Sequence, residues 1–228
     1  MPRKLINVIR SLLVILCLVW LLPVYGWSFL KDKSATHAPA VGKLLVAMPG
    51  LNSPHFASTV ILLVRYSAEG AVGLIINRPT RLTLANEFQG QVGEQQGRES
   101  LYWGGPMAMD RRVMLLEYLG NDQQREQLEP VFESIYLANS RLQFQQLLKQ
   151  EQPEHRFRVF AGYAGWGASQ LEREIVRGDW LVLPGNAELV MQQDAESIWP
   201  QLMSYQHGQM AANSLTPTST LPPQSALF

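Results

Sequence analysis

The chain begins with a long hydrophobic run that has no polar face. Residues 12–22 read LLVILCLVWLL, and no charged residue occurs from Ser11 to Leu30. A helix of 20 residues is about 30 Å long, which is enough to cross the hydrocarbon core of a bilayer. Three basic residues precede the run, and the positive-inside rule keeps that end in the cytoplasm. We therefore predict one N-terminal hydrophobic helix within residues 1–30.

Two interpretations of this helix remain open. It is either an uncleaved signal anchor or a secretory signal peptide, for which Val24-Tyr25-Gly26 is a tolerable cleavage site. We favour the anchor because apolar and aromatic residues continue past that site. Residues 31–41 are then a polar linker. The expected location is the inner membrane, single-pass, with the domain on the periplasmic side; the alternative is a periplasmic or secreted protein released by cleavage.

From Gly42 onward the pattern changes to short strands separated by glycine and proline. The segment KLLVAM (43–48) predicts a buried strand, and 58–66 and 71–77 predict a hairpin that turns at Glu69-Gly70. Residues 89–100 have the composition of an exposed loop. Further strands are predicted over 101–105, 111–119, 131–138, 156–163 and 179–184.

Helical patterns are fewer and lie between the strands. Ser140 is positioned to cap a helix that extends to Glu151. Ser169 and Glu172 have the spacing of a capping box, which predicts a helix over 169–177. A last helix is predicted near 195–206, and residues 208–228, rich in Ser, Thr and Pro, predict a disordered tail.

Strands and helices do not alternate regularly, and this favours an α+β fold over a parallel doubly wound sheet. We predict a single compact domain over residues 42–207, with a mixed sheet flanked by helices. Without the three basic residues at its N-terminus, the chain has 16 basic residues against 19 acidic ones, a net charge of −3. A mildly acidic domain does not attract nucleic acid, so nucleic acid is not an expected partner. Cys17 is the single cysteine of the 228 residues, so an intramolecular disulfide is excluded.

The stretch GYAGWGASQLERE (162–174) is the most unusual part of the domain. Its glycines are predicted to form a strand-to-helix turn whose N–H groups could bind an anion at the helix end. It has neither the phosphate-loop pattern nor the dinucleotide-binding pattern. The alternative is that the glycines allow close chain packing while Trp166 fills the core.

Two further turns could line a recess with this stretch. In INRPT (76–80), Pro79 forces Arg78 into an extended conformation that directs its guanidinium away from the sheet, and Asn77 can turn the chain. In WGGPM (103–107), Gly104 and Gly105 suit a tight turn. For Arg78, pairing with a nearby carboxylate is the commoner alternative to anion binding.

No catalytic, metal-binding or cofactor-binding signature is present in the sequence. The four histidines are scattered and none has ligand spacing to another histidine, cysteine or acid. There is no nucleophile-elbow motif, and Glu172 and Glu174 lie two residues apart on a helix, so they point in different directions. We therefore assign no catalytic residue, no metal and no cofactor.

The order of three motifs is more specific than any one of them. The segments GKLLVAMPGLNSPHFASTVILLVRYSAEGAVGLIINRP, YWGGPM and GYAGWGASQLEREIVRGDWLVLP together resemble the YqgE/AlgH family of bacterial proteins. The resemblance covers residues 42 to about 206 and implies an α+β fold with a small closed β-barrel and flanking helices. The family's biochemical function is unassigned, and some members are labelled as transcriptional regulators. Most members lack a leading apolar segment. Members also tend to have an Arg-Ser pair where this chain has Ala57-Ser58, and histidines near Tyr66 and Glu117.

The leading hypothesis is a non-catalytic binding or regulatory domain, tethered to the membrane, for a small anion or a protein partner. One alternative is a hydrolase that uses Glu172 or Glu174 with His55. The other is a cytosolic transcriptional regulator, which requires the chain start to be assigned too far upstream. The expected ligand contacts are Asn77, Arg78, Gly104, Gly105, Tyr163, Gly165, Trp166, Gly167 and Glu172.

Overall fold

The computed structural model of the chain describes residues 38–89, 92–119, 125–138, 140, 143–144, 146–147 and 156–214, with side chains as far as residue 206. All of these residues except Ala38 belong to the second of two compact units, which spans Pro39–Phe228. The predicted N-terminal helix, most of the linker and the tail beyond Ser214 lie outside the described residues. Among the described helices, none is both long and apolar enough to span a membrane.

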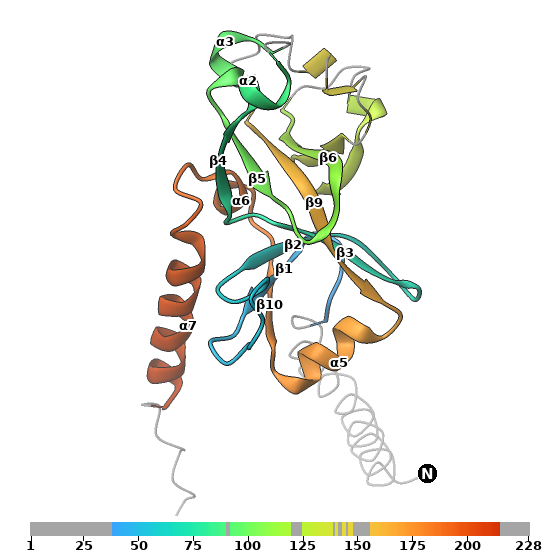
Figure 1. The fold of residues 1–228 in the computed structure, drawn as a ribbon. Helices are drawn as coiled ribbons and strands as arrows, with labels where there is room; N and C mark the ends of the chain where they lie inside the picture. The colour runs from blue at the N-terminus through green and yellow to red at the C-terminus, as the bar shows by residue number, and fades with distance from the viewer. Residues whose placement is uncertain are drawn as a thin grey trace, which may run out of the picture. The chain divides into compact units, whose positions relative to one another are not determined.

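The domain is a mixed α/β structure in which strands predominate (Figure 1). The strands are β1 (Lys43–Ala47), β2 (Val60–Ser67), β3 (Gly70–Ile75), β4 (Pro79–Thr83), β5 (Ser100–Trp103), β6 (Met107–Glu117), β7 (Glu129–Phe132), β8 (Ile135–Ala138), β9 (Phe157–Gly167) and β10 (Trp180–Pro184). The helices are α2 (Leu84–Glu87), α3 (Glu94–Gly97), the 3-10 turn η1 (Arg125–Gln127), α5 (Gln170–Arg177), α6 (Ala187–Met191) and α7 (Ile198–Ser214).

Strand β9 joins two halves of one sheet. Its last residues pair with β3, while its first residues pair with β6 on one side and, in parallel, with β5 on the other. The main order is β10-β1-β2-β3-β9-β6-β8-β7, with β4 and β5 as a side branch. In Figure 1, β9 runs from the upper half of the domain into the lower half. Every pairing except that of β5 with β9 is antiparallel.

The sheet curls into a half-barrel, which corrects the expectation of a small closed barrel. Among the described strands, β10 and β7 end the order and do not pair with each other. The two ends approach through side chains instead. A Cβ added at Gly42 would lie 2.8 Å from Phe132 Cβ, and one added at Gly185 would lie 3.0 Å from the ring of Phe132. Phe132 therefore occupies the seam where hydrogen bonds would close a barrel.

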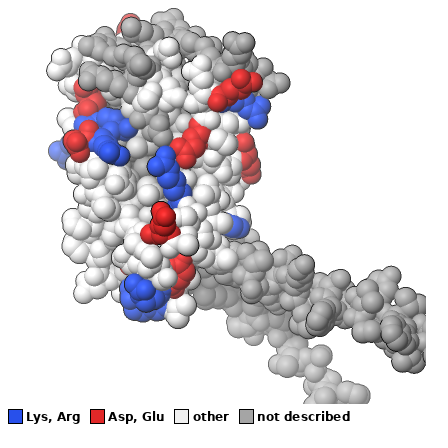
Figure 2. Space-filling view, turned by 90° about the vertical axis from the view of Figure 1, so that its right-hand side faces the viewer, with Lys and Arg blue, Asp and Glu red and all other residues white. Residues whose placement is uncertain are grey.

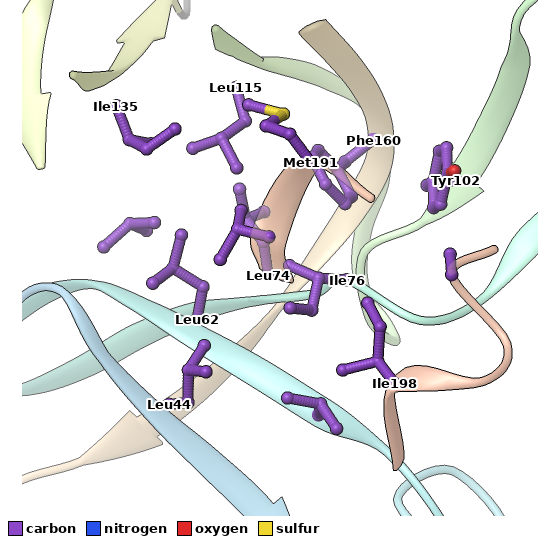
Figure 3. Close-up of a cluster of buried hydrophobic side chains, with 14 of the residues drawn as sticks. Leu44, Leu62, Leu74, Ile76, Tyr102, Leu115, Ile135, Phe160, Met191 and Ile198 are labelled. Carbon is purple, nitrogen blue, oxygen red and sulfur yellow. The ribbon is translucent and has the colours of Figure 1, made fainter. Parts of the chain in front are cut away.

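Both faces of the central strands are buried, because alternate side chains point to opposite faces. The main core cluster lies inside the curl and receives residues from β1, β2, β3, β6, β8, β9 and α6. Figure 3 shows part of it, with Leu44 and Leu62 facing Leu115 and Phe160. A second cluster on the outer face, which includes Leu45 and other residues of β1–β3, packs under α5. This double burial explains why these strands read as continuous apolar runs.

Most predicted elements are present, with shifted bounds. The strand at 43–48, the hairpin over 58–77 and the helix near 169–177 are confirmed by β1, β2–β3 and α5. The amide of Gln143 donates to Ser140 Oγ at 3.1 Å, which confirms Ser140 as a helix cap, and the described residues among 143–147 are helical.

Three expectations differ from the structure. Segment 131–138 forms the hairpin β7–β8 rather than one strand, because Glu133 adopts a positive φ of 45° at the turn. The predicted loop over 89–100 contains the short helix α3. Helix α7 continues to Ser214, past residue 207, through Gln, Met and Ala residues that favour helix.

Candidate functional site

The glycines of the stretch 162–174 lie in a strand rather than in a turn, which corrects the predicted strand-to-helix turn. Gly162 and Gly165 are inside β9, and Gly167 is its last residue. Gly162 has a φ of +70°, and a Cβ there would lie 2.5 Å from the carbonyl oxygen of Gly105. The strand was predicted to end at 163 because glycine is unusual in strand interiors. Here glycine is required because a second backbone crosses directly against it.

The Gly104–Gly105 segment is the chain that crosses. The N–H of Gly104 donates to the carbonyl of Ala161 at 2.9 Å, and a Cβ at Gly105 would overlap backbone atoms of Tyr163 and Ala164. Gly105 also has a φ of +150°. The space between these two predicted bends is therefore filled by backbone, as in the close-packing alternative, and the Gly104 amide is not available to a ligand.

The start of α5 differs from the predicted capping box. Ser169 has a left-handed φ of 57° and its side chain makes no capping hydrogen bond. Glu172 instead accepts a hydrogen bond from the Tyr66 hydroxyl at 2.6 Å, because α5 packs beside β2 and β3. The carbonyl oxygen of the Gln170 side chain accepts from the N–H of Gly167 at 3.1 Å. The Gly167 amide is therefore also occupied within the protein.

Glu174 attaches α5 to two buried indoles. One of its carboxylate oxygens accepts from Trp166 Nε1 at 2.8 Å and from Trp180 Nε1 at 2.9 Å. Phe56 packs against both indole rings. As expected, Glu172 and Glu174 point to different partners. In the part of the chain that the structure describes, neither lies within hydrogen-bond distance of His55, so the geometry does not assemble the hydrolase alternative.

Asn77 and Arg78 hold the loop that precedes β2. The buried Asn77 side chain accepts from the N–H of Val60 at 2.8 Å and donates to the carbonyl of Ser58 at 2.9 Å. It therefore binds the neighbouring segment rather than its own backbone, which corrects the expected local turn. The Arg78 guanidinium donates to the carbonyls of His55 and Ala57 at 2.7 and 2.9 Å.

Arg78 lies in an open hollow of about 410 Å³, which we call the Arg78 hollow. Its lining is His55, Asn77, Arg78, Pro79, Trp103 and Glu196. The guanidinium carbon lies over the Trp103 ring, 5.1 Å from its centroid, and the His55 ring is 6.0 Å from the same ring. Among the described residues no carboxylate is within ion-pair distance of Arg78. Partial burial lowers the pKa of Arg78, but an arginine stays charged at neutral pH.

Two other hollows are present. One, of about 640 Å³, opens at the mouth of the curl and is lined by Val72, Leu74, Arg112 and Tyr163 among others; we call it the mouth hollow. Another, of about 580 Å³, lies between β5, β9 and α3 and is lined by Tyr102 and Arg158 among others; we call it the Arg158 hollow. The three predicted bends therefore do not line one shared recess: Asn77 and Arg78 lie in one hollow and Tyr163 in another.

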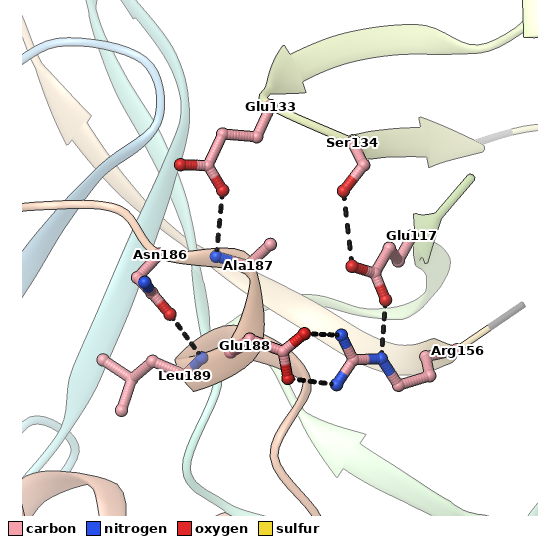
Figure 4. Close-up of polar contacts among 8 residues, drawn as sticks. All are labelled: Glu117, Glu133, Ser134, Arg156, Asn186, Ala187, Glu188 and Leu189. Carbon is pink, nitrogen blue, oxygen red and sulfur yellow. Dashed lines mark hydrogen bonds and ion pairs between the residues drawn. The ribbon is translucent and has the colours of Figure 1, made fainter. Parts of the chain in front are cut away.

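A network of charged residues beside the Arg158 hollow was not found from the sequence. Arg156 donates to Glu117 at 2.5 Å and, through two nitrogens, to Glu188 on α6 at 2.9 and 2.7 Å (Figure 4). These hydrogen bonds raise the pKa of Arg156 and lower that of Glu188. Glu133 accepts from the N–H of Ala187. Helix α6 is therefore attached to the sheet through two of its residues, Ala187 and Glu188. Arg156 lies 39 positions after Glu117 and 32 positions before Glu188, and no local pattern in the sequence indicates such contacts.

The surface charge gives no extended patch of one sign on the face drawn in Figure 2, where acidic and basic side chains are interspersed. This distribution is unlike the continuous basic stripe that binds nucleic acid. Within the described residues no group of three or more His, Cys, Asp or Glu side chains could hold a metal ion.

The model of a family described as AlgH-like matches residues 44–211. The chain belongs to the AlgH-like family. It is 36% identical over 159 residues to a UPF0301 protein of Myxococcus xanthus, which covers 68% of this chain and 84% of the relative. A UPF0301 protein of Chlamydia pneumoniae is 29% identical over 180 residues, 79% of this chain and 94% of the relative.

Two solved structures have a similar fold. The solution structure of AlgH from Pseudomonas aeruginosa is 26% identical, with a TM-score of 0.57 over 81% of this chain and 97% of that one. A crystal structure of a protein from Corynebacterium diphtheriae is 27% identical, with a TM-score of 0.60 over 75% of this chain and 88% of that one. The family resemblance seen in the three motifs is thereby confirmed.

Proposed function

We propose that the domain is a non-catalytic binding module and that its ligand is a small anion held at the Arg78 hollow. One observation carries the proposal: within the described residues, the Arg78 guanidinium has no carboxylate partner although it is partly buried against Trp103. A guanidinium taken partly out of water favours a bound anion, because it offers several parallel N–H donors.

The contacts within the hollow define what such a ligand must look like. Two guanidinium N–H groups hold the loop carbonyls, which leaves the others for a ligand. His55 and Glu196 are exposed at the rim. The anionic part would face Arg78, and a ligand with a donor group toward Glu196 is favoured. The proposal no longer uses the amides of Gly104 and Gly167, since both have partners within the protein.

The test is calorimetric titration of the full-length chain with inorganic phosphate. Arg78→Ala should weaken binding at least tenfold, because it removes a charge-assisted hydrogen-bond donor worth about 1.5–3 kcal/mol. Arg81→Ala is the matched control: it removes the same charge from an exposed position on β4, outside the lining of the hollow. Because Arg78 also holds the 55–57 loop, the melting temperature of each variant is measured alongside. Equal affinity of folded wild-type and Arg78→Ala protein would refute the site.

We further propose that residues 1–30 are a signal anchor that places the domain on the periplasmic side of the inner membrane. Support comes from the uncharged 20-residue run and the basic residues before it. Alkaline phosphatase fused after residue 41 should be active in intact cells, since the enzyme requires an oxidising compartment. An inactive fusion would favour the cytosolic regulator, and the mass of the mature N-terminus separates an anchor from a cleaved signal.

A further inference from the structure

The Arg158 hollow contains two buried polar groups that lack full partners. Arg158 is 5% exposed and Tyr102 is 8% exposed, and both line the hollow. The Arg158 guanidinium carbon lies over the Tyr102 ring, 4.7 Å from its centroid. Figure 3 shows Tyr102 at the edge of the main core cluster, with its ring near Phe160.

Arg158 is held in place but is not neutralised. It donates to the carbonyls of Ile76, at 3.0 Å, and of Gln192. These two bonds use two of its five N–H groups. Among the described residues it has no ion-pair partner. Burial lowers the pKa of Arg158, because it penalises the charged form.

The hydroxyl of Tyr102 is also unused. In the described part of the chain it makes no hydrogen bond, although the side chain is more than nine-tenths buried. Burial raises the pKa of Tyr102, so the hydroxyl remains a donor at neutral pH. Buried polar groups normally have partners, so the Tyr102 hydroxyl and the remaining N–H groups of Arg158 are available as donors on one wall of the hollow.

The remaining lining indicates the rest of the ligand. Phe157, Met191 and Pro79 make part of the wall apolar, and its volume of about 580 Å³ is in the range of small-molecule sites. Arg98 and Arg156 stand at the rim, against Glu99 as the single acid among the described lining residues. Arg98 pairs with Glu94 only in an exposed ion pair, which is weak. Arg156 is already paired with Glu117 and Glu188, so the charge that faces a ligand is that of the unpaired Arg158, which suits an anionic group.

We propose that the Arg158 hollow binds a phosphate monoester with an apolar body. The phosphate accepts from the free N–H groups of Arg158 and from the Tyr102 hydroxyl, while the body packs against Phe157 and Met191. This site is separate from the Arg78 hollow, and the proposal does not depend on the function proposed above. The two hollows share one wall residue, Pro79, which has no donor to contribute.

Phenyl phosphate is the probe, titrated by calorimetry into the full-length chain. It should bind at least tenfold more tightly than inorganic phosphate, because the apolar wall adds to the contacts, and more tightly than the monoanion benzoate. Tyr102→Phe should weaken phenyl phosphate about tenfold, since it removes one donor to a charged group. The ring and its contact with Arg158 are retained. The melting temperature should be unchanged or higher, because an unpaired buried hydroxyl is removed.

Tyr163→Phe is the matched control, since it removes a hydroxyl that likewise has no hydrogen bond among the described residues but lines the mouth hollow. It should leave phenyl phosphate binding unchanged. Unchanged binding in Tyr102→Phe, equal affinity for inorganic phosphate, or tighter binding of benzoate would each overturn the proposal. Arg78→Ala separates the two sites, because it should abolish binding at the Arg78 hollow and leave the binding of phenyl phosphate at the Arg158 hollow intact.

Discussion

At the scale of single residues, a glutamate contributes to stability when its carboxylate accepts hydrogen bonds from buried donors. Glu174 lies on α5, and Glu69 lies in the turn between β2 and β3. Glu174 accepts from two indole N–H groups, whereas the side chain of Glu69 is exposed in the β2–β3 turn. Trp166 and Trp180 are both buried, so their N–H groups cannot form hydrogen bonds with water when the carboxylate is removed.

Glu174→Ala should therefore lower the free energy of unfolding by about 2–4 kcal/mol, since two buried donors lose their acceptor. Glu174→Gln keeps one acceptor oxygen and should lose about half as much. The measurement is denaturant unfolding followed by tryptophan fluorescence. Glu69→Ala should change stability by less than about 0.5 kcal/mol. A Glu174→Ala protein as stable as the control would show that the indole contacts are not made.

At the scale of elements, glycine is required where the Gly104–Gly105 segment crosses β9. It is replaceable where no second backbone lies against the strand. Gly105 lies at the crossing, and Gly167 is the last residue of β9. A Cβ at Gly105 would overlap the backbone of Tyr163 and Ala164, and its φ is +150°. At Gly167 the nearest atom to an added Cβ is 4.0 Å away, and the backbone is not left-handed.

Gly105→Ala should prevent folding or lower the melting temperature strongly, because backbone cannot move aside as a side chain can. Gly167→Ala should be tolerated within about 1 kcal/mol, the range typical of an unstrained Gly to Ala change. Thermal unfolding monitored by circular dichroism compares the two. Similar melting temperatures for both variants would contradict the crossing of β9 by the Gly104–Gly105 segment.

At the scale of the whole molecule, the sequence predicts the individual strands and helices better than the half-barrel that they form. Burial of both faces makes β1, β2 and β3 recognisable as continuous apolar runs, and the spacing of Ser140 to the helix that follows it identifies it as a cap. The half-barrel was not predictable, because the seam at Phe132 joins residues far apart in the chain. The same holds for the candidate sites. Arg78 was identified from the sequence because it lies in the segment INRPT. Arg158 and Tyr102 are 56 residues apart and meet only through the parallel pairing of β5 with β9.

The central claim is that Arg78 and Arg158, which are partly or fully buried and make no ion pair among the described residues, each face an anion site. The most direct measurement follows the Nε–H resonances of 15N-labelled arginines in the full-length chain during titration with phenyl phosphate. We expect saturable shifts of the Arg78 and Arg158 signals, assigned with Arg78→Lys and Tyr102→Phe variants, while the exposed Arg81 signal stays in place. Arg78 and Arg158 signals that do not move, or that move only as much as the Arg81 signal, would contradict the account.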